Sequence, residues 1–99
     1  MTLRNWALRR PATQSSTFIP VQSLSKAAYA LKAVDGSVQT FSATNLEPRP
    51  WWMVDLRQKV FVYAIALKNV NDGLSVIYVV SSNISIVVIT IACSLVVIA

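Results

Sequence analysis

The residues from Trp51 to Leu56 divide into two faces with a period of two. This is the period of a β-strand, in which successive side chains point to opposite faces. One face carries Trp52, Val54 and Leu56, and the other carries Trp51, Met53 and Asp55. The next run, Val60–Leu67, is apolar on both faces and predicts a strand buried on both sides in a sandwich core.

Turn and helix signals divide the rest of the chain. The turn signals are Asp35-Gly36, Asn71-Asp72-Gly73 and the two prolines of Glu47-Pro48-Arg49-Pro50. Leu24–Leu31 predicts about two helical turns, with Ser23 or Ser25 as the N-cap. Strands and turns at this spacing, with one short helix, predict an all-β sandwich.

The C-terminal segment 74–99 has a different composition. It carries no charged side chain and is dominated by Ile and Val. About 20 apolar residues are enough to cross a bilayer as a helix. β-Branched residues also favour strands, including aggregation-prone ones. The segment is therefore compatible with a transmembrane helix or with strands.

The charge and cysteine content narrow the possible functions. The net charge is +5, but the basic residues are scattered, and no nucleic-acid-binding motif is present, so we expect no nucleic-acid partner. Cys93 is the single cysteine, which excludes an internal disulfide. The first ten residues lack the apolar run of a secretory signal peptide.

The residues that most enzymes need are missing. The chain has no histidine, and its four acidic residues lie in separate turns and strands: Asp35, Glu47, Asp55 and Asp72. No nucleophile elbow, phosphate-binding loop or His/Cys metal cluster occurs. General acid–base catalysis near neutral pH would lack its usual residue. We therefore expect no enzymatic activity.

Three ordered blocks resemble a known family. They are Asn5-Trp-Ala-Leu-Arg-Arg-Pro-Ala-Thr-Gln-Ser-Ser16, Lys32-Ala-Val-Asp-Gly36 and Pro50-Trp-Trp-Met-Val-Asp-Leu56, followed by Leu67-Lys-Asn69. The chain resembles the opening of fucolectin and tachylectin-like domains, within the discoidin, galactose-binding-like superfamily. The resemblance implies a jelly-roll β-sandwich, of which residues 1–73 would form an incomplete, N-terminal part. It also implies a calcium-dependent carbohydrate-binding module that binds glycans or glycoproteins.

The resemblance implies a calcium site around the second block. Carried over to this chain, its ligands are the Lys32 carbonyl, the Asp35 carboxylate, Ser37 in place of an asparagine, and Thr40 in place of a serine. Oxygen ligands of this kind suit a hard cation that takes six to eight of them. Without the family context, Asp35 would simply begin an Asp-Gly turn.

The sugar-binding residues of the family are not retained. The family recognises fucose through one histidine and two arginines. The histidine position falls on Ala43, the first arginine position on Val70, and the second near Ile77. Because these side chains cannot donate the required hydrogen bonds, the resemblance leaves the carbohydrate-binding residues of this chain unknown. The Trp51-Trp52 pair could stack on sugar, but the spacing favours a packing role for Trp52.

These observations divide the chain into a partial fucolectin-like domain, 1–73, and a hydrophobic segment, 74–99. Three explanations of the segment remain open: a membrane anchor, a lipid-anchor signal, or a truncated gene prediction. The alternative function is a membrane-anchored, discoidin-type adhesion or protein-interaction module without sugar binding. The family resemblance implies an extracellular or cell-surface location. All nine basic residues precede the segment, however, and basic residues beside a membrane span favour the cytoplasmic side, which would place the N-terminal part there.

Overall fold

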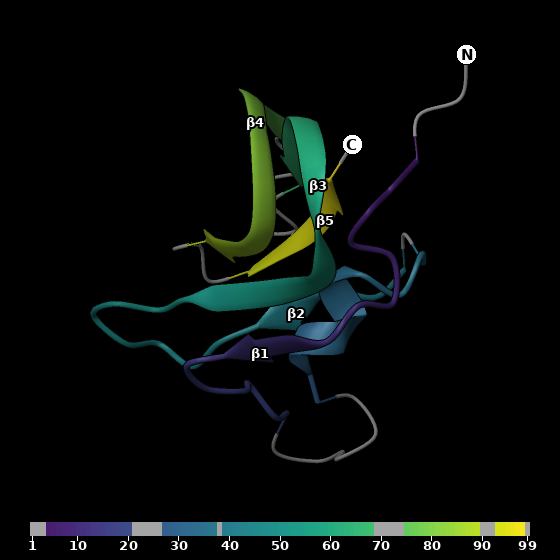
Figure 1. Cartoon of the computed structure of the whole chain (residues 1–99). Coiled ribbons are helices and arrows are strands. Elements are labelled where there is room, and N and C mark those ends of the chain that lie inside the picture. Colours follow the sequence, from purple (N-terminus) through teal and green to yellow (C-terminus); the bar gives the residue numbers. More distant parts are fainter. Residues whose placement is uncertain (1–3, 21–26, 38, 69–74, 90–92, 99) are drawn as a thin grey trace.

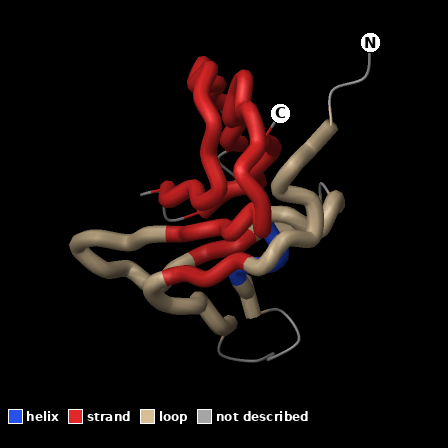
Figure 2. The backbone as a smooth tube through the Cα atoms, viewed as in Figure 1, coloured by secondary structure: helices blue, strands red, loops and turns tan. Residues whose placement is uncertain are grey.

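The computed structural model describes residues 4–20, 27–37, 39–68, 75–89 and 93–98. Five strands and one short 3₁₀ helix form in these residues (Figure 1), and Figure 2 shows how much of the N-terminal half is loop. Their bounds are β1 Ala12–Gln14, η2 Ala30–Ala33, β2 Ser42–Ala43, β3 Trp52–Lys68, β4 Ser75–Ile89 and β5 Cys93–Ile98. The prediction of an all-β fold with a short helix is confirmed.

Strand β3 is the centre of the sheet. It pairs antiparallel with β1 near its start, with β4 along most of its length, and with β5 near its end. β5 also pairs with the short strand β2, so the path through the sheet runs β1-β3-β5-β2. The two predicted strands, Trp51–Leu56 and Val60–Leu67, are therefore parts of a single long strand.

A bulge interrupts β3 between its two parts. The register with β4 shifts between Asp55 and Val60, and Arg57 adopts a positive φ of 64°. The Arg57 backbone N–H donates to Asp55 Oδ1 at 2.8 Å, so Asp55 stabilises this local turn. Bulges bend the strand that contains them. Both β3 and β4 turn a corner in the fold (Figure 1).

Burial along β3 follows the alternation of the sequence. Trp52, Val54 and Leu56 are buried, and their β4 partners Val87 and Ile89 are buried as well. The predicted division of faces over Trp51–Leu56 is confirmed.

The prediction of burial on both faces of Val60–Leu67 is wrong. Phe61 and Tyr63 are exposed on the face opposite Val60 and Val62, where their rings contact each other edge to face at 4.8 Å. The alternation then changes phase, because a second register shift between Val62 and Ala64 makes Ile65 and Leu67 the buried positions. Only one side of this part of β3 faces the core.

Trp52 joins β3 to the helix. Its side chain is 1% exposed, and its indole Nε1 donates to the carbonyl oxygen of Ala30 at 2.9 Å. The helix η2 begins at Ala30 and is a single turn, later and shorter than the predicted Leu24–Leu31. Residues 24–26 of that range lie outside the described residues. Ala28 is instead buried and exchanges backbone hydrogen bonds with Phe18 and Ala43, and these bonds replace those of a helix.

The two ends of the described chain lie against each other. The Trp6 backbone N–H donates to the Ile98 carbonyl at 2.7 Å. The Asn5 side-chain oxygen accepts from the backbone N–H groups of Ile98 and Ala7, each at 3.1 Å. Ile98 itself is fully buried, so β5 closes the core beside the N-terminal turn.

The described residues of the segment 74–99 form strands β4 and β5. Of the two conformations left open by its composition, these residues adopt the strand. Across the described chain, no helix has the length and apolar character needed to cross a membrane. The boundary expected at residue 73 falls within residues 69–74, outside the described part, so it stays a prediction.

Replacing Trp52 with Phe should destabilise the fold. The variant leaves the buried Ala30 carbonyl without its donor and removes part of a fully buried ring, which together cost about 2–3 kcal/mol. Urea unfolding followed by circular dichroism would measure the loss. Trp51→Phe is the matched control and should change the unfolding free energy by less than about 0.5 kcal/mol, because Trp51 is 38% exposed. Equal effects of the two substitutions would contradict this role of Trp52.

Candidate functional site

A segment that begins in the last residues of η2 gathers the four residues predicted to hold calcium. We call it the Asp35 loop, and its described residues are Lys32–Ser37 with Gln39 and Thr40. The Thr40 hydroxyl donates to Asp35 Oδ2 at 2.6 Å and lies 3.4 Å from the Lys32 carbonyl oxygen. It also lies 3.5 Å from the Ser37 carbonyl oxygen. Residues eight positions apart in the sequence therefore meet around one hydroxyl group.

Both oxygens of the Asp35 carboxylate accept hydrogen bonds within this loop. Oδ1 accepts from the Ser37 backbone N–H at 2.9 Å, which closes an Asx turn, and Oδ2 accepts from Thr40. The Ser37 hydroxyl oxygen is engaged by the Gln39 backbone N–H at 3.1 Å. Ser37 thus contacts Thr40 through its carbonyl oxygen, while its hydroxyl, the group that the family resemblance assigned to the cation, accepts from Gln39.

The donor set of the Asp35 loop fits a hard cation. It offers one carboxylate, the carbonyls of Lys32 and Ser37, and the Thr40 hydroxyl, which can turn from donating a proton to offering its lone pairs. All are oxygens, as calcium and magnesium prefer, and calcium accepts water molecules for its remaining positions. Within the described residues, no three His, Cys, Asp or Glu side chains come together, so a softer metal would have no matching ligands there.

Gly36 makes the tight turn of this loop possible. Its φ is +85°, a conformation that residues with a Cβ rarely adopt. A Cβ at this position would also lie 3.1 Å from Leu8 Cδ1. The glycine therefore lets the Asp35 loop turn directly beneath the N-terminal turn.

Three chain segments are joined by backbone hydrogen bonds next to the Asp35 loop. Phe18 donates to the Ala43 carbonyl, Ala43 donates to the Ala28 carbonyl, and Ala28 donates to the Phe18 carbonyl, at 2.9–3.1 Å. The Gln14 amide Nε2 adds donations to the Ala28 and Ala43 carbonyls at 3.0 and 3.3 Å. This ring of hydrogen bonds holds residues that are 10 and more positions apart in a fixed arrangement.

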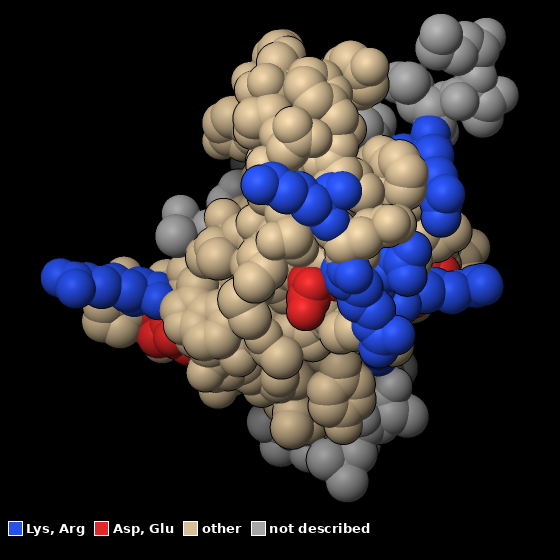
Figure 3. All heavy atoms as spheres, viewed as in Figure 1, with Lys and Arg blue, Asp and Glu red and all other residues tan. Residues whose placement is uncertain are grey.

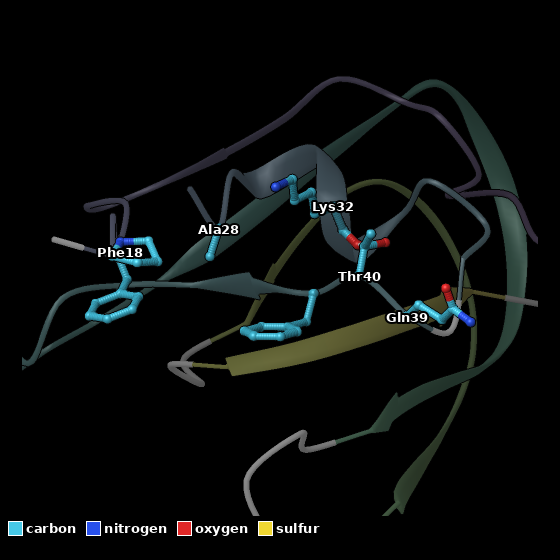
Figure 4. Close-up of a pocket in the computed structure, with 7 residues that line it drawn as sticks. Phe18, Ala28, Lys32, Gln39 and Thr40 are labelled. Atoms are coloured by element: carbon cyan, nitrogen blue, oxygen red, sulfur yellow. The ribbon is translucent and has the colours of Figure 1, made fainter. Parts of the chain in front are cut away.

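An open groove of about 430 Å³ lies over these segments. We call it the Phe18–Phe41 groove, and its lining residues are Phe18, Pro20, Ala28, Lys32, Gln39, Thr40 and Phe41. In Figure 4, Phe18 stands at one end and Gln39 at the other, with Ala28, Lys32 and Thr40 between them. Lys32 and Thr40 belong to both the groove and the Asp35 loop, so the two features share a wall.

The two described sugar-binding positions of the family, Ala43 and Ile77, are not among the residues that line this groove. Ala43, at the histidine position, is 6% exposed in β2, where its N–H and carbonyl form the hydrogen bonds described above. Val70, at the first arginine position, lies outside the described residues. Ile77, near the second, is exposed on β4 opposite Ala66 of β3.

The three described acidic residues lie in different elements. Asp35 sits in its loop, Glu47 accepts a hydrogen bond from the Ser16 hydroxyl, and Asp55 stabilises the bulge of β3. Most basic side chains visible in Figure 3 lie over one side of that face, with acidic groups among them, and one basic group extends at the opposite side.

Comparison with known proteins identifies the fold family. The profile of the F5/F8 type C family, described as NedA-like, galactose-binding domain, matches residues 32–90, which is more than half of the chain. The chain belongs to this family. The predicted membership of the galactose-binding-like superfamily is confirmed, and the match continues beyond the last block that carried the resemblance. A comparison with curated proteins found no match.

Solved structures of carbohydrate-binding lectin modules share this fold. The lectin domain of lectinolysin, complexed with Lewis B antigen, is similar with a TM-score of 0.76 at 20% identity, covering 100% of this chain and 98% of that one. A fucose-binding module of Streptococcus pneumoniae has a TM-score of 0.57 at 19% identity, covering 97% of this chain and 82% of that one. At such identities the likeness establishes the galactose-binding-like fold.

Sequence reasoning found the Asp35 loop but missed the groove beside it. Phe18, Gln39 and Phe41 carry no motif of their own, and they come from segments on either side of η2. The available signal was the proximity of two aromatic residues to the Lys32–Thr40 block. That signal becomes informative only when the pairing of residues 18, 28 and 43 is known.

Replacing Gly36 with Ala should destabilise the protein by about 1–2 kcal/mol, because the Cβ of alanine disfavours the positive φ that this position requires. Thermal and urea unfolding would measure the loss. Introducing Gly36→Ala into a Leu8→Ala background separates the two causes, since the shortened side chain removes the close contact with the new Cβ. The cost should persist in that background. If Gly36→Ala causes no loss of stability in the Leu8→Ala background, the contact with Leu8, rather than the backbone conformation, is the cause of the loss.

Proposed function

We propose that this protein is a calcium-dependent carbohydrate-binding module whose sugar site is the Phe18–Phe41 groove. The observation that carries the proposal is the shared wall: Lys32 and Thr40 line the groove while their carbonyl and hydroxyl oxygens belong to the Asp35 loop. A cation held in the loop would therefore order the groove. The family and its lectin modules of the same fold support a carbohydrate as the ligand.

The groove combines the two kinds of group that bind a sugar ring. Phe18 and Phe41 offer apolar surface to the C–H face of the ring, and Phe18 is about half exposed. Lys32, Gln39 and Thr40 supply polar groups for the ring hydroxyls. A mainly apolar concavity with a few placed polar groups is the usual form of a small-molecule site.

The polar groups of the groove differ from those used to bind fucose in the family. A buried alanine occupies the histidine position, so Ala43 can offer a ligand no side-chain hydrogen bond. The amide of Gln39 both donates and accepts, whereas two arginines would only donate. We infer that the module selects a neutral sugar through Gln39 and Lys32, and that its preference differs from that of the fucose-binding modules.

We assign calcium to the Asp35 loop as the ion that stabilises this end of the fold. The site has a single carboxylate, and sites of low charge bind calcium weakly. Extracellular calcium modules work with dissociation constants of roughly 10⁻⁴–10⁻³ M. A weak site of this kind suits a protein outside the cell or at its surface, which is the location we propose.

Removing an aromatic wall of the groove should weaken sugar binding. In isothermal titration against the best neutral ligand from a glycan array, Phe41→Ala and Phe18→Ala should each lower affinity about five- to tenfold, since an aromatic contact contributes about 1 kcal/mol. Tyr63→Ala is the matched control, because Tyr63 is an exposed aromatic of β3 outside the groove. Equal loss in the control variant, or unchanged affinity in both groove variants, would place the sugar elsewhere.

Calcium should raise the melting temperature of the protein through the Asp35 loop. At 100 times the dissociation constant, a single site stabilises the folded state by about 2.7 kcal/mol. Asp35→Asn should abolish the shift, because it removes the one charged ligand, and Thr40→Val should reduce it. Asp55→Asn is the control, since Asp55 stabilises the bulge of β3 and should leave the calcium response intact. A calcium response retained in Asp35→Asn would exclude this site.

A second candidate is an adhesion or protein-interaction module without sugar binding. Apolar side chains exposed on β4 favour it, among them Ile77, Tyr78 and Val79. An exposed apolar strand of this kind offers surface for a partner. A folded protein that binds no glycan on the array would favour this candidate.

A further inference from the structure

A second groove lies on the opposite face of β3 from the core. It has a volume of about 490 Å³ and is lined by Pro48, Arg49, Pro50, Trp51 and Val88. We call it the Trp51 groove. None of its residues lines the Phe18–Phe41 groove. Val88 pairs with Met53, two positions after Trp51, so both belong to the outward face of the β3–β4 pair.

Trp51 is held in place by its backbone while its ring remains accessible. Its N–H donates to the Ser15 hydroxyl at 3.1 Å, and its carbonyl accepts from the Ser15 N–H at 2.9 Å. Its side chain is nevertheless 38% exposed, in contrast to the buried Trp52. Val88 beside it is 58% exposed. An anchored aromatic ring with an apolar neighbour is a surface on which a sugar ring can stack.

The loop that carries Arg49 is restrained at both ends. At one end, the Ser16 hydroxyl donates to the Glu47 carboxylate and accepts from the Asn45 N–H. At the other end, Ser15 holds Trp51. Pro48 and Pro50 fix their own φ angles and restrict the residue before each of them, which includes Arg49. A loop already ordered in this way loses little conformational entropy when a ligand binds.

Arg49 is the charged group of this groove. It is exposed, and it forms no hydrogen bond or ion pair with another described residue; Glu47, two positions earlier, is engaged with Ser16. Figure 3 shows basic side-chain atoms extending from the loop between β2 and β3, away from the other basic groups on that face. A guanidinium group matches a carboxylate with two parallel hydrogen bonds.

We propose that the Trp51 groove is a second carbohydrate subsite that takes a sugar ring bearing a carboxylate, such as a terminal uronic acid. The apolar face of the ring stacks on Trp51 against Val88, and its carboxylate pairs with Arg49. The proposal extends the carbohydrate-binding function above but uses separate residues. One groove can therefore bind its ligand when the other does not.

Titration of the full chain with a glucuronate-terminated oligosaccharide and with its glucose-terminated counterpart tests this proposal. At the Trp51 groove, the acidic sugar should bind at least tenfold more tightly than the neutral one, and raising the salt concentration should reduce that difference. Arg49→Gln should remove the preference, and Arg49→Lys should retain part of it. Trp51→Ala should weaken the binding of both oligosaccharides at this groove. Phe41→Ala should leave binding of the acidic sugar at the Trp51 groove unchanged. A loss of neutral-sugar binding in that variant concerns only the Phe18–Phe41 groove.

Several outcomes would overturn the proposal. These are equal affinity for the two oligosaccharides, an unchanged preference in Arg49→Gln, and no binding of the acidic sugar by the folded chain. Equally tight binding of an aspartate-containing peptide would also overturn it, because Arg49 would then be a general carboxylate site. Both substituted side chains are at the surface, and circular dichroism of Arg49→Gln and Trp51→Ala would establish that each variant folds.

Discussion

The hydrogen bond from the Trp52 indole to the Ala30 carbonyl connects the sheet to the functional end of the molecule. Trp52 belongs to β3, the strand with which β1, β4 and β5 all pair. Ala30 begins η2, and the Asp35 loop begins in the last residues of that helix. A buried donor and acceptor that satisfy each other hold this spacing firmly, because breaking the pair would leave a polar group in the core without a partner. The position of both the loop and the groove depends on that contact.

The sequence predicted the parts of the fold that depend on local pattern. The alternation over Trp51–Leu56 was sufficient to assign both faces, because burial on one side of a strand leaves a period-two signal. The bulges could not be predicted in this way. The run Val60–Leu67 has no charged residue to mark an outward face, so it suggests burial on both faces although Phe61 and Tyr63 are exposed. Helix propensity in the Ala-rich stretch was overridden by the hydrogen bonds of Ala28 with distant residues.

The candidate sites show the same distinction. The Asp35 loop is contiguous, so a short motif was enough to group Lys32, Asp35, Ser37 and Thr40, and the structure brings them together. Each groove instead draws on segments far apart in the sequence, as when Val88 of β4 joins Trp51. Such a site has no sequence signature, because its geometry is produced by strand pairing. The Trp-Trp pair illustrates the point: adjacent residues of one type face opposite sides, one in the core and one in a groove.

The pairing of Trp6 with Ile98 has a consequence for how the polypeptide reaches its folded state. Synthesis proceeds from the N-terminus, so Asn5 and Trp6 leave the ribosome long before the backbone groups that they bind. Contacts between residues so far apart close last and slowly, since most of the chain must first be ordered. Until then Val87 and Ile89 of β4 have no completed core to cover them. A partly folded chain that exposes such apolar surface is prone to associate with other copies.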